Sequence, residues 1–375
     1  MEEMFNSCSA LISIDFSYFN SEKINNMAML FNSCSSLQSI NFANFNTKKV
    51  TNMTQLFKGC SNLKYIDLSK FDTENVIDMG YMFYSCGNLN KIDISNFNVK
   101  NVAKMHYMFF ECINLSSISL PNSDYQKLTN IEYMFYDCRN LLSINLLNMN
   151  TQYSKDMSFM FYNCFSLRSL DLSNFNTQNI VNMSNMFSSC NDLRTIDISN
   201  FNTQNLLYMN RMFYNCFLLF EIDISNFNTE KVLNMDELFY GCTLLTYLNL
   251  DKFNTTNVIS MKSMFQNCYY LKSINIASFD TKNVTNMADM FNKCISLTSL
   301  NLTNFDTKKV NNMTSMFYEC HSLANLDISS FETTNSNVDI ISSVANTGII
   351  TVNLNFFDKI RNQIPKTWKT IIINN

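Results

Sequence analysis

The sequence repeats with a strict period of 26 residues. Its thirteen cysteines all fall on this period, at positions 8, 34, 60, 86, 112, 138, 164, 190, 216, 242, 268, 294 and 320. Phe precedes every cysteine by three residues, and Leu follows every cysteine by three. A unit this short cannot bury its own apolar side chains, so it has to stack on copies of itself. We therefore expect one solenoid domain of about thirteen repeats over residues 1–333.

Each repeat is expected to contain one short strand and one short helix. Apolar residues flank a polar residue in the phrase Ile66, Asp67, Leu68, which is the alternation of a half-buried strand. The segment 177–190 spaces its Ile, Met, Phe and Cys residues as one side of an α-helix does, and Thr177 is expected to cap the first turn. The predicted fold class is α/β, with parallel strands on a concave face and short helices on a convex face.

The repeat also resembles a known family. The run LxxIDLSNFNTxxVxNMxxMFxxCxxL is nearly intact at 167–193 and 193–219, and the resemblance extends over residues 4–333. It is similar to the BspA-like leucine-rich-repeat surface proteins, in the 26-residue form of mycoplasma-type lipoproteins. This resemblance implies a leucine-rich-repeat solenoid, a role in adhesion or recognition at a cell surface or as a secreted protein, and no catalytic residues. Members are expected to begin with a signal peptide or lipobox, which MEEMFNSC does not resemble, so localisation is left open.

Composition excludes several classes of function. The net charge is -4 and no run of Lys or Arg forms a basic stripe, which argues against nucleic-acid binding. No stretch of 18 apolar residues is present, so we expect no membrane span. The chain offers no convergent Ser, His and Asp set, no glycine-rich phosphate loop and no metal-ligand spacing. We therefore expect no enzyme activity, no cofactor and no metal.

The cysteine and methionine columns are predicted to be core. Neighbouring repeats would place successive thiols about 5 Å apart, which leaves disulfides or oxidation-sensitive thiols as alternatives. However, each cysteine shares a side with the Phe and Leu columns, where free Cys behaves as a small buried hydrophobe. Only two His residues are present, and no CxxC pair. Helical spacing likewise places Met183 and Met186 in the core rather than at a soft-metal site.

The polar strand positions form a candidate binding face. Seven residues after the cysteine, Asp171, Asp197 and Asp223 make the longest acidic run, which a cationic peptide, a divalent ion or a glycan would suit. The alternative is a solvated face that deters aggregation. Five residues after the cysteine most repeats carry Ser, and selectivity is expected where this uniformity breaks. The exceptions singled out are Tyr65, Lys91, Glu221 and Tyr247.

A candidate aromatic stripe occupies the position two residues before the cysteine. Four successive repeats carry an aromatic residue there: Tyr84, Phe110, Tyr136 and Tyr162. One ring per coil would form an interaction stripe on the flank of the solenoid. The alternative is that the rings stack on each other and cover the corner.

The two ends of the repeat array differ. The period stops near residue 334, and residues 334–375 are expected to cap the last coil. No comparable segment precedes the first coil, so dimerisation through this uncapped N-terminal coil, or additional upstream sequence, would cover it.

The sequence leaves two functions open. The first is a noncatalytic recognition or adhesion module that binds protein or glycan partners at a cell surface. The second is an intracellular scaffold for protein–protein interactions, which suits the many free cysteines.

Overall fold

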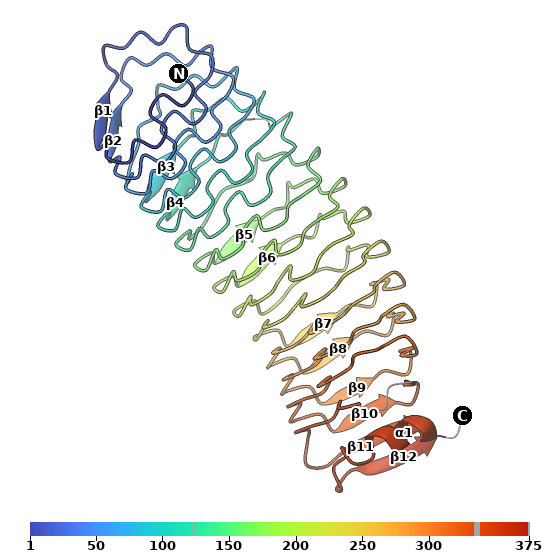
Figure 1. Ribbon diagram of the computed structural model, residues 1–375. Helices are drawn as coiled ribbons and strands as arrows, with labels where there is room; N and C mark the ends of the chain where they lie inside the picture. Colours follow the sequence, from blue (N-terminus) through green and yellow to red (C-terminus); the bar gives the residue numbers. More distant parts are fainter. Residues whose placement is uncertain (124, 334–337, 374–375) are drawn as a thin grey trace. The chain divides into compact units, whose positions relative to one another are not determined.

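The computed structural model describes residues 1–123, 125–333 and 338–373. Contacts group the chain into two compact units. Unit 1 comprises residues 1–180 and 189–200, and unit 2 comprises residues 181–188 and 201–375. Within each unit the chain winds in successive parallel coils (Figure 1). The predicted solenoid is therefore confirmed within each unit, whereas the division into a repeat domain of 1–333 and a cap stays a prediction.

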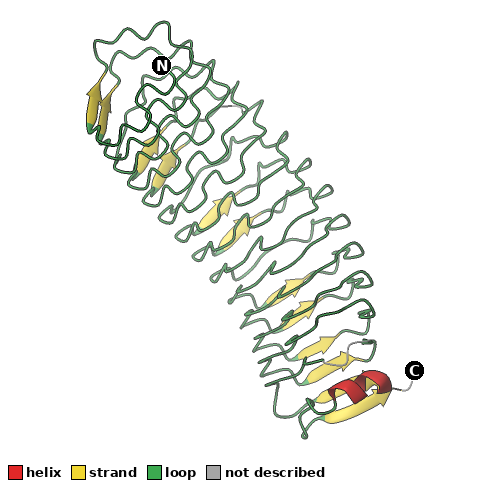
Figure 2. Ribbon diagram, in the orientation of Figure 1, coloured by secondary structure: helices red, strands yellow, loops and turns green. Residues whose placement is uncertain are grey.

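The strands of unit 1 lie on one side of the coils and pair in parallel (Figure 2). Each pair joins strands that lie one period apart, as Ile14 does with Ile40. The equivalent residues 65–67 and 143–145 form no strand, so the expectation of one strand in every repeat is wrong for these coils, including its example at Ile66, Asp67 and Leu68. The middle residue of each strand points inward and the outer two are exposed. The strands are β1 (Ser13–Asp15), β2 (Ser39–Asn41), β3 (Lys91–Asp93), β4 (Ser117–Ser119), β5 (Ser169–Asp171) and β6 (Thr195–Asp197).

Unit 2 repeats this arrangement and then departs from the period. A pair of strands is followed by a four-stranded sheet in the order β12-β11-β10-β9. Asn325 pairs with Ile349, and Ile349 with Lys369, so the period shortens after β10. The elements are β7 (Tyr247–Asn249), β8 (Ser273–Asn275), β9 (Ser299–Asn301), β10 (Asn325–Ile328), β11 (Ile349–Asn353), α1 (Leu354–Ile360) and β12 (Lys369–Ile373).

The predicted helices opposite the strands are wrong. Among the described residues α1 is the single α-helix, and the segments expected to be helical form runs of successive turns (Figure 2). Two residues in such a segment, for example Met29 and Ser33, have φ of 54° and 60°, which no right-handed helix accommodates. The N–H of Phe31 donates to the carbonyl of Leu56 in the next coil, at 3.0 Å, and that of Leu30 to Met27, at 3.2 Å.

The apolar spacing of these segments fits both structures, which explains the error. Residues three apart share a side in a helix and also in this run of turns, because turns close by bonds between residues i and i-3. Stacked coils supply carbonyl acceptors at every second residue, so the backbone does not need an internal helical ladder to satisfy its N–H groups.

The recurring Thr of the repeats has a different role from the predicted helix cap. The hydroxyl of Thr255 donates to the carbonyl of Asp280 in the next coil, at 2.9 Å, and accepts the N–H of Asp280, at 2.8 Å. Thr255 is fully buried. The predicted cap is wrong because no helix begins there, and the hydroxyl instead satisfies two backbone groups between coils.

The core of each unit consists of columns of identical side chains. Within unit 1, the rings of Phe109 and Phe135 stack with centroids 5.6 Å apart and planes 3° apart. Within unit 2, Phe213 and Phe239 stack in the same way, at 5.6 Å. Met, Cys and Leu columns line the same interior and are buried from the second coil onward. The predicted placement of these columns in the core is confirmed.

The cysteines pack as the sequence predicts. All thirteen carry free thiols, and every one except Cys8 is buried. Each buried thiol donates a hydrogen bond to a Phe carbonyl of the preceding coil, as Cys268 does to Phe239 at 3.1 Å. Burial raises the pKa of Cys268 to about 12, so the reactive thiolate is strongly disfavoured.

The predicted cap lies partly outside the described residues, which omit 334–337 and 374–375. Within 338–373, α1 packs against the last coils: the ring of Phe356 contacts Phe331 at 5.6 Å, and Phe356 and Ile360 are buried. Neither a capping role for this segment nor dimerisation through the first coil is tested by these contacts, and both stay predictions.

Candidate functional site

The side chains of the acidic column on the strand face accept hydrogen bonds from nearby backbone N–H groups. The carboxylate of Asp171 accepts the N–H of Ser173 at 2.9 Å, and that of Asp223 accepts the N–H of Ser225, also at 2.9 Å. Asn249 makes the equivalent bond to the N–H of Asp251, at 3.2 Å. This turn, in which an Asx side chain accepts a backbone N–H two residues on, needs an oxygen acceptor rather than a charge.

The side chains of all three predicted acidic residues are exposed: Asp171, Asp197 and Asp223. They do not lie in one row within one unit. Asp171 and Asp197 are neighbours in the register of β5 and β6 within unit 1, whereas Asp223 belongs to unit 2. The side-chain and backbone hydrogen bonds from Ser173 lower the pKa of Asp171. This geometry favours a structural role, and a ligand on these carboxylates stays a prediction.

The four exceptional side chains at the position five residues after the cysteine make no comparable hydrogen bond. The side chains of Tyr65 and Tyr247 are 66% and 54% exposed, and Lys91 and Glu221 are exposed as well. Throughout 1–123, 125–333 and 338–373, no hydrogen bond, ring contact or ion pair joins these four side chains to another residue. They are therefore the residues of the predicted face that are free to contact a partner.

The predicted aromatic stripe is a continuous stack. Tyr84, Phe110, Tyr136 and Tyr162 follow one another at centroid distances of 4.5, 4.4 and 4.6 Å, with planes within 10°. All four rings are half-buried. The alternative in which the rings stack on each other is therefore observed, whereas an interaction role for their exposed margin stays a prediction.

A second aromatic column, which was not predicted from the sequence, lies beside the first. Its members occupy the position five residues before the cysteine and stack at 4.7, 4.5 and 4.6 Å: Tyr81, Tyr107, Tyr133 and Phe159. Rings of the two columns also touch, as Tyr107 and Phe110 do at 5.5 Å. The signal was a second aromatic three residues before the first in the same four repeats. We call these eight residues the aromatic ladder.

Charged groups surround the aromatic ladder. The ammonium of Lys58 lies 5.4 Å from the ring centroid of Tyr81 and 5.0 Å from that of Tyr84, so a cation covers one end of both columns. Burial and neighbouring charges raise the pKa of Tyr136 to about 12. Glu111 contributes to this shift, and its carboxylate accepts a hydrogen bond from the hydroxyl of Ser85 at 2.7 Å.

Unit 2 fills the same two positions with a smaller cluster. The rings of Tyr214 and Tyr240 stack at 4.6 Å. The guanidinium of Arg211 lies 5.8 Å from the ring centroid of Tyr214 and bonds both carboxylate oxygens of Glu237 at 2.9 Å. Here one basic group contacts a tyrosine ring and forms an ion pair with a carboxylate.

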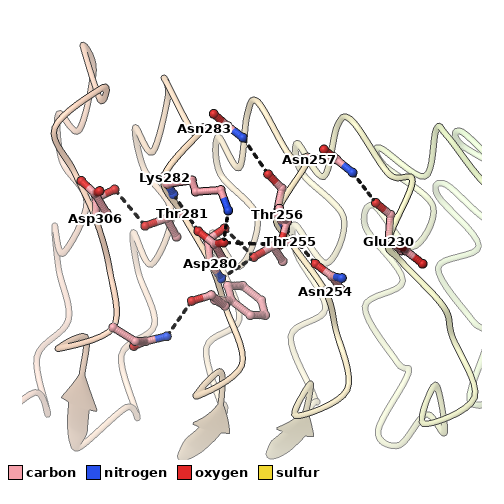
Figure 3. Close-up of polar contacts among 12 residues, drawn as sticks. Glu230, Asn254, Thr255, Thr256, Asn257, Asp280, Thr281, Lys282, Asn283 and Asp306 are labelled. Carbon is pink, nitrogen blue, oxygen red and sulfur yellow. Dashed lines mark hydrogen bonds and ion pairs between the residues drawn. The ribbon is translucent and has the colours of Figure 1, made fainter.

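Polar ladders complete the surface away from the strands. Figure 3 shows one of them in unit 2, where the amide of Asn257 donates to the carbonyl of Glu230 at 2.7 Å and that of Asn283 to the carbonyl of Thr256 at 2.9 Å. Lys282 forms an ion pair with Asp280 at 2.8 Å. The two amides join neighbouring coils and Lys282 is paired within its own coil, so these side chains are poor candidates for binding.

Two findings concern other kinds of site. Across the described ranges, no three His, Cys, Asp or Glu side chains gather closely enough to hold a metal ion. A membrane-crossing helix, which has to be long and apolar, is also not found in the part of the chain that the structure describes. The expected absence of cofactors and catalytic residues stays a prediction.

The chain matches one family model and is distantly similar to solved structures. A family model described as "Mycoplasma protein of unknown function, DUF285" matches residues 1–119, 38–143, 129–246 and 234–349. Among solved structures, the TLR13 chain of a TLR13-ssRNA13 complex is 17% identical with a TM-score of 0.31, and the match covers 96% of this chain and 53% of that one. An internalin, inlF, from Listeria monocytogenes is 15% identical with a TM-score of 0.22, covering 84% and 83%.

These structural likenesses are too distant to carry an inference about function. The chain spans about half the length of the TLR13 chain that it matches. No curated protein matches the sequence. What the surfaces do has to be argued from their own chemistry.

Proposed function

Because the chain belongs to the DUF285 family of Mycoplasma proteins of unknown function, we propose from its surfaces that it is a noncatalytic recognition module. It binds a protein or glycan partner at a cell surface, as the BspA-like resemblance implies. The binding face is the exposed strand face of each unit.

The position five residues after the cysteine carries this proposal. The core columns and the Asx turns repeat almost without change, since each coil needs them to pack and to close. Tyr65 and Tyr247 break the uniformity at a position with no structural contact, and both are more than half exposed. Tyrosine supplies a large contact area and a hydrogen-bonding hydroxyl at little entropic cost, which suits recognition.

One observation favours the alternative of an intracellular scaffold that uses the same face. Twelve of the thirteen cysteines are buried as free thiols that donate hydrogen bonds to Phe carbonyls. Free thiols persist most readily in a reducing compartment. Protease shaving of intact cells distinguishes the two locations, because a surface protein loses its exposed segments and an internal one does not.

The experiment that tests recognition is an array of glycans and candidate surface proteins. It compares the wild type with a double variant, Tyr65→Ser and Tyr247→Ser, which restores the residue most repeats carry. Tyr18→Ser is the matched control, because Tyr18 is fully exposed and belongs to another column.

We expect the wild type and Tyr18→Ser to bind the same spots and the double variant to lose them. Unchanged binding by the double variant contradicts the assignment of the strand face. Absence of any wild-type binding contradicts the recognition function itself.

A further inference from the structure

The aromatic ladder presents ring margins rather than ring faces. Tyr107, Phe110, Tyr133 and Tyr136 each have a parallel ring on both sides, at 4.4 to 4.7 Å. Their half-exposed area is therefore the edge of each ring. A sugar ring stacks on an open aromatic face, and these four residues offer none. The ladder suits a partner that approaches through polar or charged side chains.

Two carboxylates next to the ladder have no ion-pair partner among the described residues. Glu111 accepts a hydrogen bond from the hydroxyl of Ser85, the residue after Tyr84, and Glu132 directly precedes Tyr133. Burial is the main cause that raises the pKa values of the ladder tyrosines, and the carboxylates add to it: Glu132 at Tyr81, Tyr107 and Tyr133, and Glu111 at Tyr84 and Tyr136. Neither glutamate takes part in an ion pair within the described ranges.

The neighbouring acids differ in this respect. Asp78 is paired with Lys104 at 3.1 Å, and Asp137 with Arg139 at 3.0 Å. Glu111 and Glu132 are only half-buried. Arg139 lies near Glu111 as well, but its ion pair is with Asp137. The surface beside the rings therefore carries two carboxylates that form no ion pair among the described residues.

The molecule itself shows which group satisfies this combination. In unit 2 the basic side chain of Arg211 contacts the Tyr214 ring and the Glu237 carboxylate together. In unit 1 the ammonium of Lys58 covers the first rings of the ladder. In both places a basic side chain lies over a tyrosine ring, and Arg211 also pairs with a carboxylate. Because the interior rings of the ladder have no open face, the attraction that applies to them is the charge complementarity of a basic group with the carboxylates beside them.

We propose that the aromatic ladder, with Glu111 and Glu132, is a second interaction surface that docks an arginine- and lysine-rich segment of a protein partner. The guanidinium and ammonium groups pair with the two carboxylates, and their aliphatic stems pack on the ring edges. This surface differs from the strand face and from the polar ladders that join the coils. It takes a protein rather than a carbohydrate.

The test measures binding of a fluorescent oligo-arginine peptide by anisotropy. The variant combines Glu111→Gln and Glu132→Gln, which removes both charges and leaves every ring in place. The matched control combines Glu22→Gln and Glu74→Gln, which removes the same charge from exposed glutamates of the same unit. An oligo-glutamine peptide of equal length serves as the uncharged probe.

We expect the ladder variant to bind oligo-arginine about fivefold to tenfold more weakly than the wild type, which is the size of two partly exposed ion pairs. The control variant is expected to bind like the wild type, and oligo-glutamine not to bind. Raising the ionic strength from about 0.15 M to about 1 M should weaken wild-type binding, because screening shortens the range of the attraction.

The proposal is overturned by no wild-type binding, by equal binding of the ladder variant, or by an equal loss in the control variant, which would mean unspecific attraction to net charge. Binding of a neutral glycan that the ladder variant loses would also overturn it, in favour of a carbohydrate. The strand-face variant, Tyr65→Ser and Tyr247→Ser, should bind oligo-arginine normally, so failure of one surface is distinguishable from failure of the other.

Discussion

The same two outer columns are filled in different ways in the two units. In unit 1 eight aromatic rings stack over four successive coils. In unit 2 the same positions hold Arg211, Glu237 and the tyrosine pair Tyr214 and Tyr240. Both fillings lie on an unchanged coil, with the same Phe stack beneath them. The fold of the coil therefore fixes the positions of these side chains but does not fix which residue types occupy them.

The interior should respond equally in the two units. Phe109 in unit 1 and Phe239 in unit 2 are both fully buried and stacked on both sides. We expect Phe109→Ala and Phe239→Ala each to lower the free energy of unfolding by about 3–5 kcal/mol, because each leaves a large cavity. Chemical denaturation followed by circular dichroism measures this loss. Clearly unequal losses of unfolding free energy would contradict the view that both units have the same interior packing.

The outer columns should respond unequally. Tyr107→Ala removes stacking with Tyr81 and Tyr133 and is expected to cost about 1–3 kcal/mol of unfolding free energy. Arg211→Ala removes the half-exposed guanidinium that pairs with Glu237 and contacts the Tyr214 ring, and it is expected to cost about 1 kcal/mol. The same denaturation experiment compares them, and a larger loss for Arg211→Ala would reverse the comparison.

The ladder should also make unit 1 sensitive to high pH. Burial raises the pKa values of Tyr107 and Tyr136 above the ordinary value of 10.0, that of Tyr136 to about 12. The folded state then holds these phenol protons more tightly than the unfolded chain. This stabilisation is complete below the ordinary pKa and is lost as the pH rises through the folded pKa.

Tyrosinate absorbance measured against pH tests this expectation. Part of the wild-type signal should titrate well above the ordinary pKa, and Tyr136→Phe should reduce that late fraction. A titration in which all tyrosinate appears near pH 10.0 would contradict the buried environment of the ladder.

The smallest expected effect concerns the acidic strand column. Asp171→Asn keeps an oxygen that accepts the N–H of Ser173, so the unfolding free energy near neutral pH should change by less than about 0.5 kcal/mol. Asp171→Ala loses the acceptor and should cost about 1 kcal/mol. If Asn proved as damaging as Ala, the charge rather than the turn would be what matters, and a bound cation would become the better explanation.

Much of the fold could be predicted because the period is strict. The Phe, Cys and Leu columns identified the interior. The alternation of apolar and polar residues identified the side of the coil on which strands form, but its example at Ile66, Asp67 and Leu68 is not a strand. The turn runs could not be distinguished from helices, since both place residues three apart on one side. The deciding fact, that backbone N–H groups bond to the next coil, is a property of the stack and not of any one repeat.

The candidate site was predicted only in part. Exposed exceptions such as Tyr65 and Tyr247 are visible as departures from a consensus, and one aromatic column was found in that way. The second column, with Tyr107 and Tyr133, was hidden because it was assigned to a helix. The Asx turn at Asp171 was missed because a row of carboxylates was interpreted as a ligand site, whereas each carboxylate accepts a backbone N–H.

The separation of a repeating frame from freely variable surface residues is tested most directly by one measurement of stability. A quadruple variant replaces the four exceptional residues five positions after the cysteine with the common one: Tyr65→Ser, Lys91→Ser, Glu221→Ser and Tyr247→Ser. Since these side chains are exposed and make no described contact, its free energy of unfolding should lie within about 1 kcal/mol of the wild-type value. A loss of several kcal/mol would show that these residues hold the coils together, and would contradict their assignment to recognition.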